Sequence, residues 1–120
     1  MNLAENEVLV YHDPDDSRVD DIKAFLEPFH MDIIQLDWYA NKFDVYGWNQ
    51  ILIMLGHDDL IDILNREHPD FILLVQDKDL APDQLAHTVI RHPGMIKGPL
   101  VCKGKTALIC EDPAAVLDLF

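Results

Sequence analysis

Cysteine is scarce in this chain, and the two cysteines present lie inside apolar stretches. Cys102 and Cys110 are the only thiols among 120 residues. So few cysteines exclude a disulfide-rich scaffold, and their apolar neighbours predict buried, reduced thiols. A single bridge remains possible if the two residues lie directly opposite each other in a hairpin. We therefore expect a cytoplasmic protein that folds around a hydrophobic core.

Basic residues are also few. The chain has 9 Lys and Arg against 22 Asp and Glu, which gives a net charge of −13. Binding to a phosphate backbone needs clustered Lys and Arg, so no nucleic-acid partner is expected, and the acidic surface favours basic partners. No apolar run approaches the roughly 20 residues of a membrane helix. The first ten residues lack the pattern of a signal peptide. We expect no membrane association.

The composition, 49% hydrophobic over 120 residues, suits one globular domain of residues 1–120, with a polar segment 1–7 that is expected to fray. Val8–Tyr11 is an unbroken apolar run typical of a buried strand, and residues 31–37 alternate as a second strand. Residues 99–102 and 106–110 flank Lys-Gly-Lys, which predicts a hairpin.

Helical periodicity fills most of the remaining chain. Ser17 is the expected N-cap of a first helix that ends near Pro28, and Asn49 is the expected cap of a second helix that stops at Gly56. Between them, residues 38–48 are expected to be irregular. Residues 71–75, FILLV, favour a strand by local propensity. The other predicted helices are 58–68, 82–92 and one that begins at Asp112-Pro113.

The loop after the first strand is the first place to look for chemistry. His12 ends the apolar run, and Asp13–Ser17 leads into the helix that begins near Arg18. In open α/β sheets, functional groups gather at the carboxyl ends of the strands. This loop has carboxylates, a histidine and an arginine, but no cysteine, glycine or lysine.

A recognisable pattern runs through the C-terminal third and the first loop. Its segments are Asp83–Leu85, Arg91–Val101, Lys105–Cys110 and Ala114–Asp118, with Asp13-Pro14 and Ser17-Arg18 flanking the first loop. This pattern resembles the arsenate-reductase (ArsC)/Spx-like family of thioredoxin-like proteins. The resemblance implies an α/β fold with a sheet of about four strands flanked by helices and a C-terminal β-hairpin followed by a helix. It also implies that Pro99 follows a cis peptide bond.

The departures from the family pattern fall on its reactive groups. The nucleophilic cysteine that the resemblance places in the first loop has no counterpart, and Asp16 offers a permanent anion instead. Gly98 and Ala107 stand where the family has oxyanion-binding arginines, and a third such arginine has no equivalent near residues 46–51. The positions assigned to this degenerate site are Asp13, Pro14, Asp15, Asp16, Ser17, Arg18, Lys97, Gly98, Pro99 and Ala107.

We therefore predict a non-enzymatic binding or regulatory protein with an unidentified protein partner and no cofactor. The alternative is a residual thiol oxidoreductase or oxyanion-handling enzyme, which would need Cys102 or Cys110 exposed near the loop, with Arg18 and Lys97 facing an anion. A grip on RNA polymerase of the Spx type is disfavoured by the shortage of basic residues and by the missing Cys-x-x-Cys pair.

The acidic residues raise two further hypotheses. Asp13, Asp15 and Asp16 could bind a divalent cation, as the Asp-x-Asp of haloacid-dehalogenase-like phosphatases does, but acids that cap a helix are favoured. A response-regulator receiver domain would place a phosphorylated aspartate after a strand at 71–75, where this chain has Gln76 and then Asp77.

Histidines and aromatic residues add weaker indications. None of the six histidines has the i, i+4 spacing of a helical zinc site, so surface or capping roles are favoured, with His12 notable for its place beside the first loop. The aromatic residues between 38 and 48 could form a partner surface or could pack in the core, and core packing is favoured.

Overall fold

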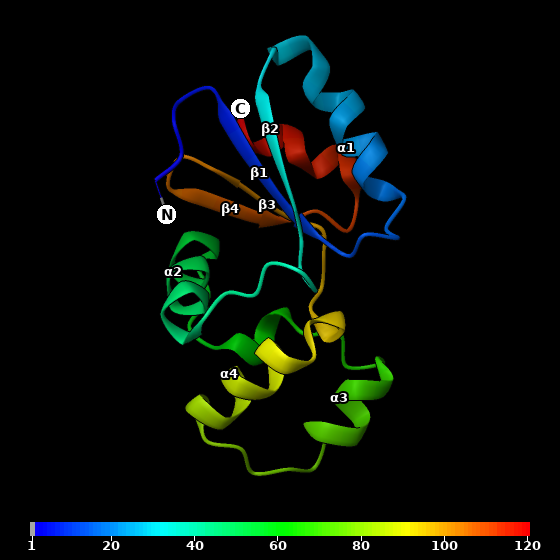
Figure 1. Cartoon of the computed structure of the whole chain (residues 1–120), viewed down its shortest axis with the longest axis vertical. Helices are drawn as coiled ribbons and strands as arrows, with labels where there is room; N and C mark the ends of the chain where they lie inside the picture. The colour runs from blue at the N-terminus through cyan, green and yellow to red at the C-terminus, as the bar shows by residue number, and fades with distance from the viewer. Residues whose placement is uncertain (1) are drawn as a thin grey trace. The chain divides into compact units, whose positions relative to one another are not determined.

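The computed structural model describes residues 2–120 and divides the chain into two compact units. The first comprises Met1–Asn41 and Gly98–Phe120, and the second comprises Lys42–Lys97. Figure 1 follows the chain through both, from the strands of the first unit to the helices of the second and back. Each unit is described by itself.

A four-stranded mixed sheet forms the first unit, with the strand order β2-β1-β3-β4. The first two strands are parallel, and β3 runs antiparallel to β1 and pairs with β4 in a hairpin. Gly104 takes the positive φ of 59° that the hairpin turn requires. The predicted four-stranded sheet and C-terminal hairpin are confirmed. The strands are β1 (Glu7–His12), β2 (Asp32–Asp37), β3 (Leu100–Lys103) and β4 (Thr106–Ile109).

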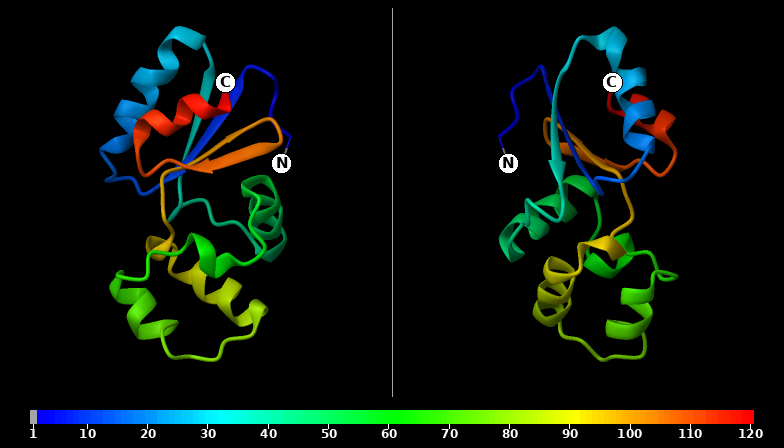
Figure 2. Two further views of the ribbon diagram at one scale, coloured as in Figure 1. Left: turned by 180° about the vertical axis from the view of Figure 1, so that it is seen from behind. Right: turned by 45° about the vertical axis from the view of Figure 1, so that its right-hand side comes forward.

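Two helices cover one face of this sheet, as Figure 2 shows. Helix α1 (Arg18–Leu26) continues into a short 3-10 helix, η1 (Glu27–Phe29), where Pro28 ends the regular hydrogen bonding. The C-terminal 3-10 helix, η4 (Pro113–Leu119), packs beside α1. Its first turn is capped by the carboxylate of Asp112, which accepts the Ala114 N–H at 3.0 Å.

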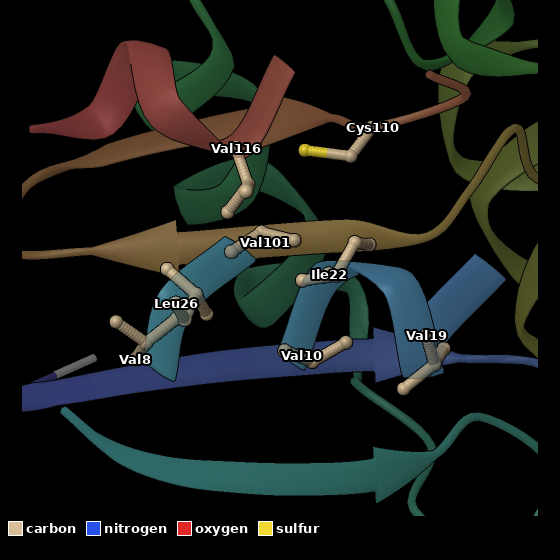
Figure 3. Close-up of a cluster of buried hydrophobic side chains, with 8 residues drawn as sticks. All are labelled: Val8, Val10, Val19, Ile22, Leu26, Val101, Cys110 and Val116. Carbon is tan, nitrogen blue, oxygen red and sulfur yellow. The ribbon is translucent and has the colours of Figure 1, made fainter. Parts of the chain in front are cut away.

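The core of this unit lies between the sheet and these two helices (Figure 3). Alternate residues of β1 point to the same face, and the i, i+3, i+7 residues of α1 face them across the layer. Burial of these side chains is what fixes the register of the sheet. The buried cluster consists of Val8, Val10, Val19, Ile22, Leu26, Val101, Cys110 and Val116.

The second unit is helical. Its longest helix, α2, is followed by the 3-10 helix η2, then by α3, α4 and the 3-10 helix η3. A single bridge between Leu64 and Ile96 brings the segments after η2 and η3 together, and the Asn65 N–H donates to the Met95 carbonyl at 2.7 Å. The helices are α2 (Val45–Leu55), η2 (Leu60–Ile63), α3 (Pro69–Leu74), α4 (Pro82–Arg91) and η3 (Pro93–Met95).

The predicted strand at residues 71–75 is wrong, because these residues belong mainly to helix α3. Pro69 occupies the first turn of this helix, and the His68 ring accepts the Asp70 N–H at 3.0 Å. These start signals outweigh the β-propensity of FILLV. In the helix, Ile72 and Leu73 lie exposed, so the apolar run is not a buried strand.

Three predicted helix boundaries are also corrected. The second helix begins four residues before Asn49, at Val45, because the carboxylate of Asp44 caps it by accepting the Gly47 N–H at 2.7 Å. The helix predicted for residues 58–68 is only the short η2, and the last helix is 3-10 rather than α.

Residues 4–7, within the segment expected to fray, form a turn in which the Glu7 N–H donates to the Ala4 carbonyl.

Candidate functional site

The first loop is closed by an ion pair between Asp16 and Arg18. One carboxylate oxygen of Asp16, Oδ1, accepts the backbone N–H of Arg18 at 3.0 Å and its Nε–H at 2.9 Å. The other, Oδ2, accepts from Nη2 at 2.7 Å. The Arg18 guanidinium also donates to the Glu111 carbonyl at 3.3 Å. Asp16 thus occupies both the first N–H of α1 and the Nε/Nη2 edge of the guanidinium, two groups suited to binding an external anion.

The electrostatics of this pair follow from its geometry. The hydrogen bond from the Arg18 side chain lowers the pKa of Asp16, against the opposing effect of partial burial. The same bond raises the pKa of Arg18. The Asp16 side chain is only 12% exposed, whereas that of Arg18 is 40% exposed. The loop therefore keeps a fixed negative charge where an oxyanion would need a positive one.

The other residues of the loop form turns. The Asp13 carboxylate accepts the Asp15 N–H at 2.9 Å, and the Tyr39 hydroxyl donates to its second oxygen at 3.4 Å. Ser17 stands at the N-cap position as predicted, but its backbone is already helical and its hydroxyl makes no capping bond. The Asp16 carboxylate takes that role. Within residues 2–120, no group of three His, Cys, Asp or Glu residues, the loop aspartates included, is arranged to hold a metal ion.

A shallow polar hollow of about 300 Å³ lies against this loop. His12 and Gln35 line one part of it, and Pro14, Asp15 and Asp16 line another. His12 is almost fully buried, and its Nδ1 lies 2.7 Å from the Asp13 carbonyl, to which it donates, since a carbonyl only accepts. The Gln35 amide nitrogen lies 3.3 Å from Nε2. The aspartates of the lining, Asp15, Asp16 and Asp20, make the hollow acidic.

The segment before the hairpin brings Gly98 against a tryptophan. The Gly98–Pro99 bond is cis, as the resemblance implies. A Cβ built on Gly98 would lie 2.8 Å from Cζ3 and 3.0 Å from Cη2 of Trp38, a side chain that is itself only 3% exposed. The Pro99 carbonyl accepts the Cys110 N–H at 2.7 Å. The Trp38 ring thus occupies the space that any larger residue at position 98 would need.

The remaining predicted positions are Ala107 in the hairpin and Lys97. Ala107 is buried in β4 opposite Cys102. Lys97 belongs to the second unit, where its N–H donates to the Ile63 carbonyl at 2.8 Å. The structure brings Asp13–Arg18 together in one loop and places Gly98 and Pro99 at the start of the hairpin segment.

Both cysteines are free and completely buried. Burial raises the pKa of the Cys102 thiol to about 12 and that of Cys110 to about 11. The neighbouring Cys110 adds to the shift of Cys102, and the carboxylates of Asp118 and Asp112 add to that of Cys110. The register pairs Cys102 with Ala107, so the condition for a cross-hairpin disulfide, that the two cysteines lie directly opposite, is not met. Figure 3 shows the Cys110 sulfur inside the core cluster. The exposed thiol that a thiol oxidoreductase requires is absent from residues 2–120.

Two further predictions concern segments outside the loop, namely the residues after 71–75 and the aromatic residues between 38 and 48. Gln76 and Asp77 follow helix α3 rather than a strand, so the receiver-domain hypothesis is wrong. The aromatic segment divides: Trp38 and Trp48 are buried, as core packing predicts, whereas Tyr39 and Tyr46 are exposed. No helix in residues 2–120 has the length and apolar character needed to cross a membrane.

Sequence reasoning missed two contacts that define this site. The Asp16–Arg18 pair had a visible signal, since an Asp-x-Arg sequence at a helix start can form an Asx-type turn closed by an ion pair. The packing of Trp38 on Gly98 had none, because sixty residues of sequence separate the two positions.

Replacing Asp16 with Ala should lower the free energy of unfolding by about 1 kcal/mol near neutral pH, since a capping acceptor and a partly exposed ion pair are lost. The pKa of Asp16 is lower in the folded chain than its ordinary value of 3.8. Its contribution is therefore complete above 3.8 and is lost as the pH falls through the folded-state value. Urea unfolding curves of the two proteins should converge in acid.

The control for this substitution is Asp15→Ala, which removes an exposed neighbouring carboxylate of the same loop. Among the described residues, the Asp15 side chain has no hydrogen-bond or ion-pair partner. We expect a change within about 0.5 kcal/mol for this variant. An equal loss in both variants, or a difference that persists in acid, would contradict the assigned role of Asp16.

The chain is similar to known proteins over most of its length. Residues 22–119 match the model of the ArsC family. An arsenate reductase of Haemophilus influenzae is 26% identical over 113 residues, which are 93% of this chain and 97% of that protein. The solved arsenate reductase from Vibrio cholerae superposes with a TM-score of 0.85 at 21% identity, over 98% of this chain and all of that one.

A more distant solved structure shares the same architecture. The solution structure of an arsenate reductase (ArsC) related protein from Brucella melitensis has a TM-score of 0.67 at 17% identity and covers 95% of this chain and 94% of its own. At this level of identity, the likeness of the two solved structures concerns the fold. The thioredoxin-like α/β fold expected from the sequence is therefore confirmed.

Proposed function

The chain belongs to the ArsC family, and on that premise we propose that it is a non-enzymatic binding or regulatory protein that uses the family's thioredoxin-like scaffold as a single cytoplasmic domain. Its relatives carry the name arsenate reductase, which denotes reduction of an oxyanion. The proposal is that this chain keeps the scaffold and lacks that chemistry.

The observation that carries the proposal is the occupation of the first loop by Asp16. An oxyanion at this loop would need the α1 N-terminus and Arg18, but the Asp16 carboxylate already bonds to the Arg18 backbone N–H, Nε and Nη2. Displacing it would leave two negative charges facing each other in a partly buried site, which is unfavourable. Asp16 therefore acts as a built-in substitute for the anion.

The cysteines support the same proposal. A thiol attacks as its thiolate, and a nucleophilic cysteine needs a lowered pKa and access to solvent. Cys102 and Cys110 have raised pKa values of about 12 and about 11, and neither side chain is exposed. A carboxylate such as that of Asp16 cannot replace a thiolate, because it cannot form a disulfide or be oxidised and reduced in a cycle.

The test is an assay of arsenate-dependent oxidation of a small thiol donor by the purified full chain, with the Haemophilus influenzae arsenate reductase as the positive control. We expect no turnover above the rate without protein. Arsenate-dependent turnover that disappears in Cys102→Ser or Cys110→Ser would overturn the proposal and favour a residual thiol oxidoreductase. Turnover that persists in both variants but disappears in Asp16→Ala would overturn it equally.

A further inference from the structure

The second unit contains a groove that is lined only by residues of that unit. Helices α2, η2 and α4 enclose a cavity of about 350 Å³, at the lower end of the range typical of ligand pockets. The buried part of its lining is apolar: Trp48 and Leu52 come from α2, Leu60 from η2 and Ala86 from α4. The groove has room for one large apolar side chain and part of its neighbours.

The exposed part of the same lining is acidic. Asp58 and Asp59 precede η2, and Asp83 lies in the first turn of α4. No Lys, Arg or His side chain lines the groove, and none of the three carboxylates takes part in an ion pair among residues 2–120. Asp59 stands at the N-cap position of η2 but makes no capping bond with its side chain. Among residues 2–120, no basic side chain neutralises these three charges.

From this arrangement we infer that the groove docks an exposed basic segment of a partner protein, in which an apolar side chain is flanked by Lys or Arg. The apolar side chain would enter between α2, η2 and α4, and its basic neighbours would face Asp58, Asp59 and Asp83. This inference rests on the proposed binding function and names the chemistry of the partner.

Charge selects this partner over other macromolecules. The chain carries a net charge of −13, and the groove mouth has three uncompensated carboxylates. Nucleic acids and anionic lipid surfaces would be repelled at short range. A basic peptide is attracted instead, and the attraction weakens as salt screens it over about 10 Å at 0.1 M ionic strength. An apolar pocket with an acidic mouth thus combines burial with charge complementarity.

The test is an NMR titration of the full chain with the peptide Lys-Lys-Leu-Leu-Lys-Lys, blocked at both ends. We expect shifts at the Trp48 indole and at the Leu52, Leu60 and Ala86 methyl groups, and a Kd of about 0.1–1 mM at low salt, because the contact is small and partly exposed. The matched peptides have Ser-Ser in place of Leu-Leu, or Glu in place of every Lys. Neither should shift the groove signals at the same concentrations.

Two triple variants separate local from general attraction. Asp58→Asn, Asp59→Asn and Asp83→Asn together should weaken binding of the basic peptide about tenfold at low salt. Asp21→Asn, Asp32→Asn and Asp118→Asn remove the same charge from exposed positions of the first unit and should change the Kd by less than about twofold. Equal weakening by both variants, shifts that map outside the groove, or binding of the serine peptide would overturn the inference.

The outcome is independent of the test of the proposed function. If the chain binds none of the peptides and is inactive with arsenate, the docking inference is wrong and the non-enzymatic proposal stands. If the chain reduces arsenate, the non-enzymatic proposal is wrong, whatever the titration shows at the groove.

Discussion

In the folded protein, Cys102 should react with an aromatic disulfide reagent at pH 8 about a thousand times more slowly than in the chain unfolded by guanidinium, and Cys110 about a hundred times more slowly. Only the thiolate reacts, and burial raises the pKa values from the ordinary 9.0 to about 12 and about 11. The measurement is the release of the aromatic thiol over time, with Cys102→Ser and Cys110→Ser identifying each thiol.

Exclusion of the reagent from the core slows both reactions further. A thiol that reacts in the folded chain as fast as in the unfolded one would contradict the buried assignment. It would also remove one support of the non-enzymatic proposal, because an accessible thiol is the first requirement of a thiol oxidoreductase.

The same pKa values predict loss of stability in alkali. In the unfolded chain the thiols lose their protons near pH 9.0, whereas the folded chain holds them until about 11 and about 12. The stabilising contribution of the protonated thiols is therefore complete below pH 9 and is lost as the pH rises through the folded-state values. Each thiol contributes a slope of about 1.4 kcal/mol per pH unit in this interval. Cys102→Ala should flatten the alkaline limb.

The sheet could be predicted because its strands carry their own signals. Val8–Tyr11 is buried on both faces and is therefore continuous and apolar, whereas β4 is short and follows a turn that contains Gly104. The second helix was placed too late because residues 38–48 contain many aromatic residues. Its true cap, Asp44, lies within this segment, and Trp48 turns out to be a core residue of α2.

The strand prediction for residues 71–75, FILLV, is wrong for a different reason. Periodicity cannot separate a short apolar helix from a strand, and the capping ring of His68 is not among the common N-cap signals. Residue propensity favoured a strand, whereas Pro69 at the first helical position favoured a helix. The local start of the helix outweighed the propensity of the residues that follow it.

At the candidate site, the sequence predicted which groups are missing but not what fills their places. The lack of a cysteine between Asp13 and Arg18 is visible in the sequence. The three hydrogen bonds of Asp16 depend on the backbone geometry of the folded loop, which the sequence does not reveal. Trp38 and Gly98 are distant in sequence and meet only when β2 and the hairpin segment join the same unit. The Trp38 ring can pack against position 98 because Gly98 has no side chain.

That packing contact predicts the cost of adding a side chain at position 98. Gly98→Ala should lower the free energy of unfolding by about 1–3 kcal/mol, because the new Cβ would lie 2.8 Å and 3.0 Å from two atoms of the buried Trp38 ring. The loss of chain entropy in the unfolded state returns less than about 1 kcal/mol. Gly98→Arg, which restores the residue type expected from the family pattern, should cost at least as much. Urea unfolding measures both.

A double-mutant cycle with Trp38→Phe distinguishes the ring contact from any intrinsic need for glycine. Phenylalanine lacks the outer ring atoms Cζ3 and Cη2 and also the indole N–H, which has no hydrogen-bond partner among residues 2–120. In the Trp38→Phe background, Gly98→Ala should therefore cost at least about 1 kcal/mol less than in the wild type. An unchanged cost would show that the penalty at position 98 does not come from the Trp38 ring but from an intrinsic requirement for glycine at this position.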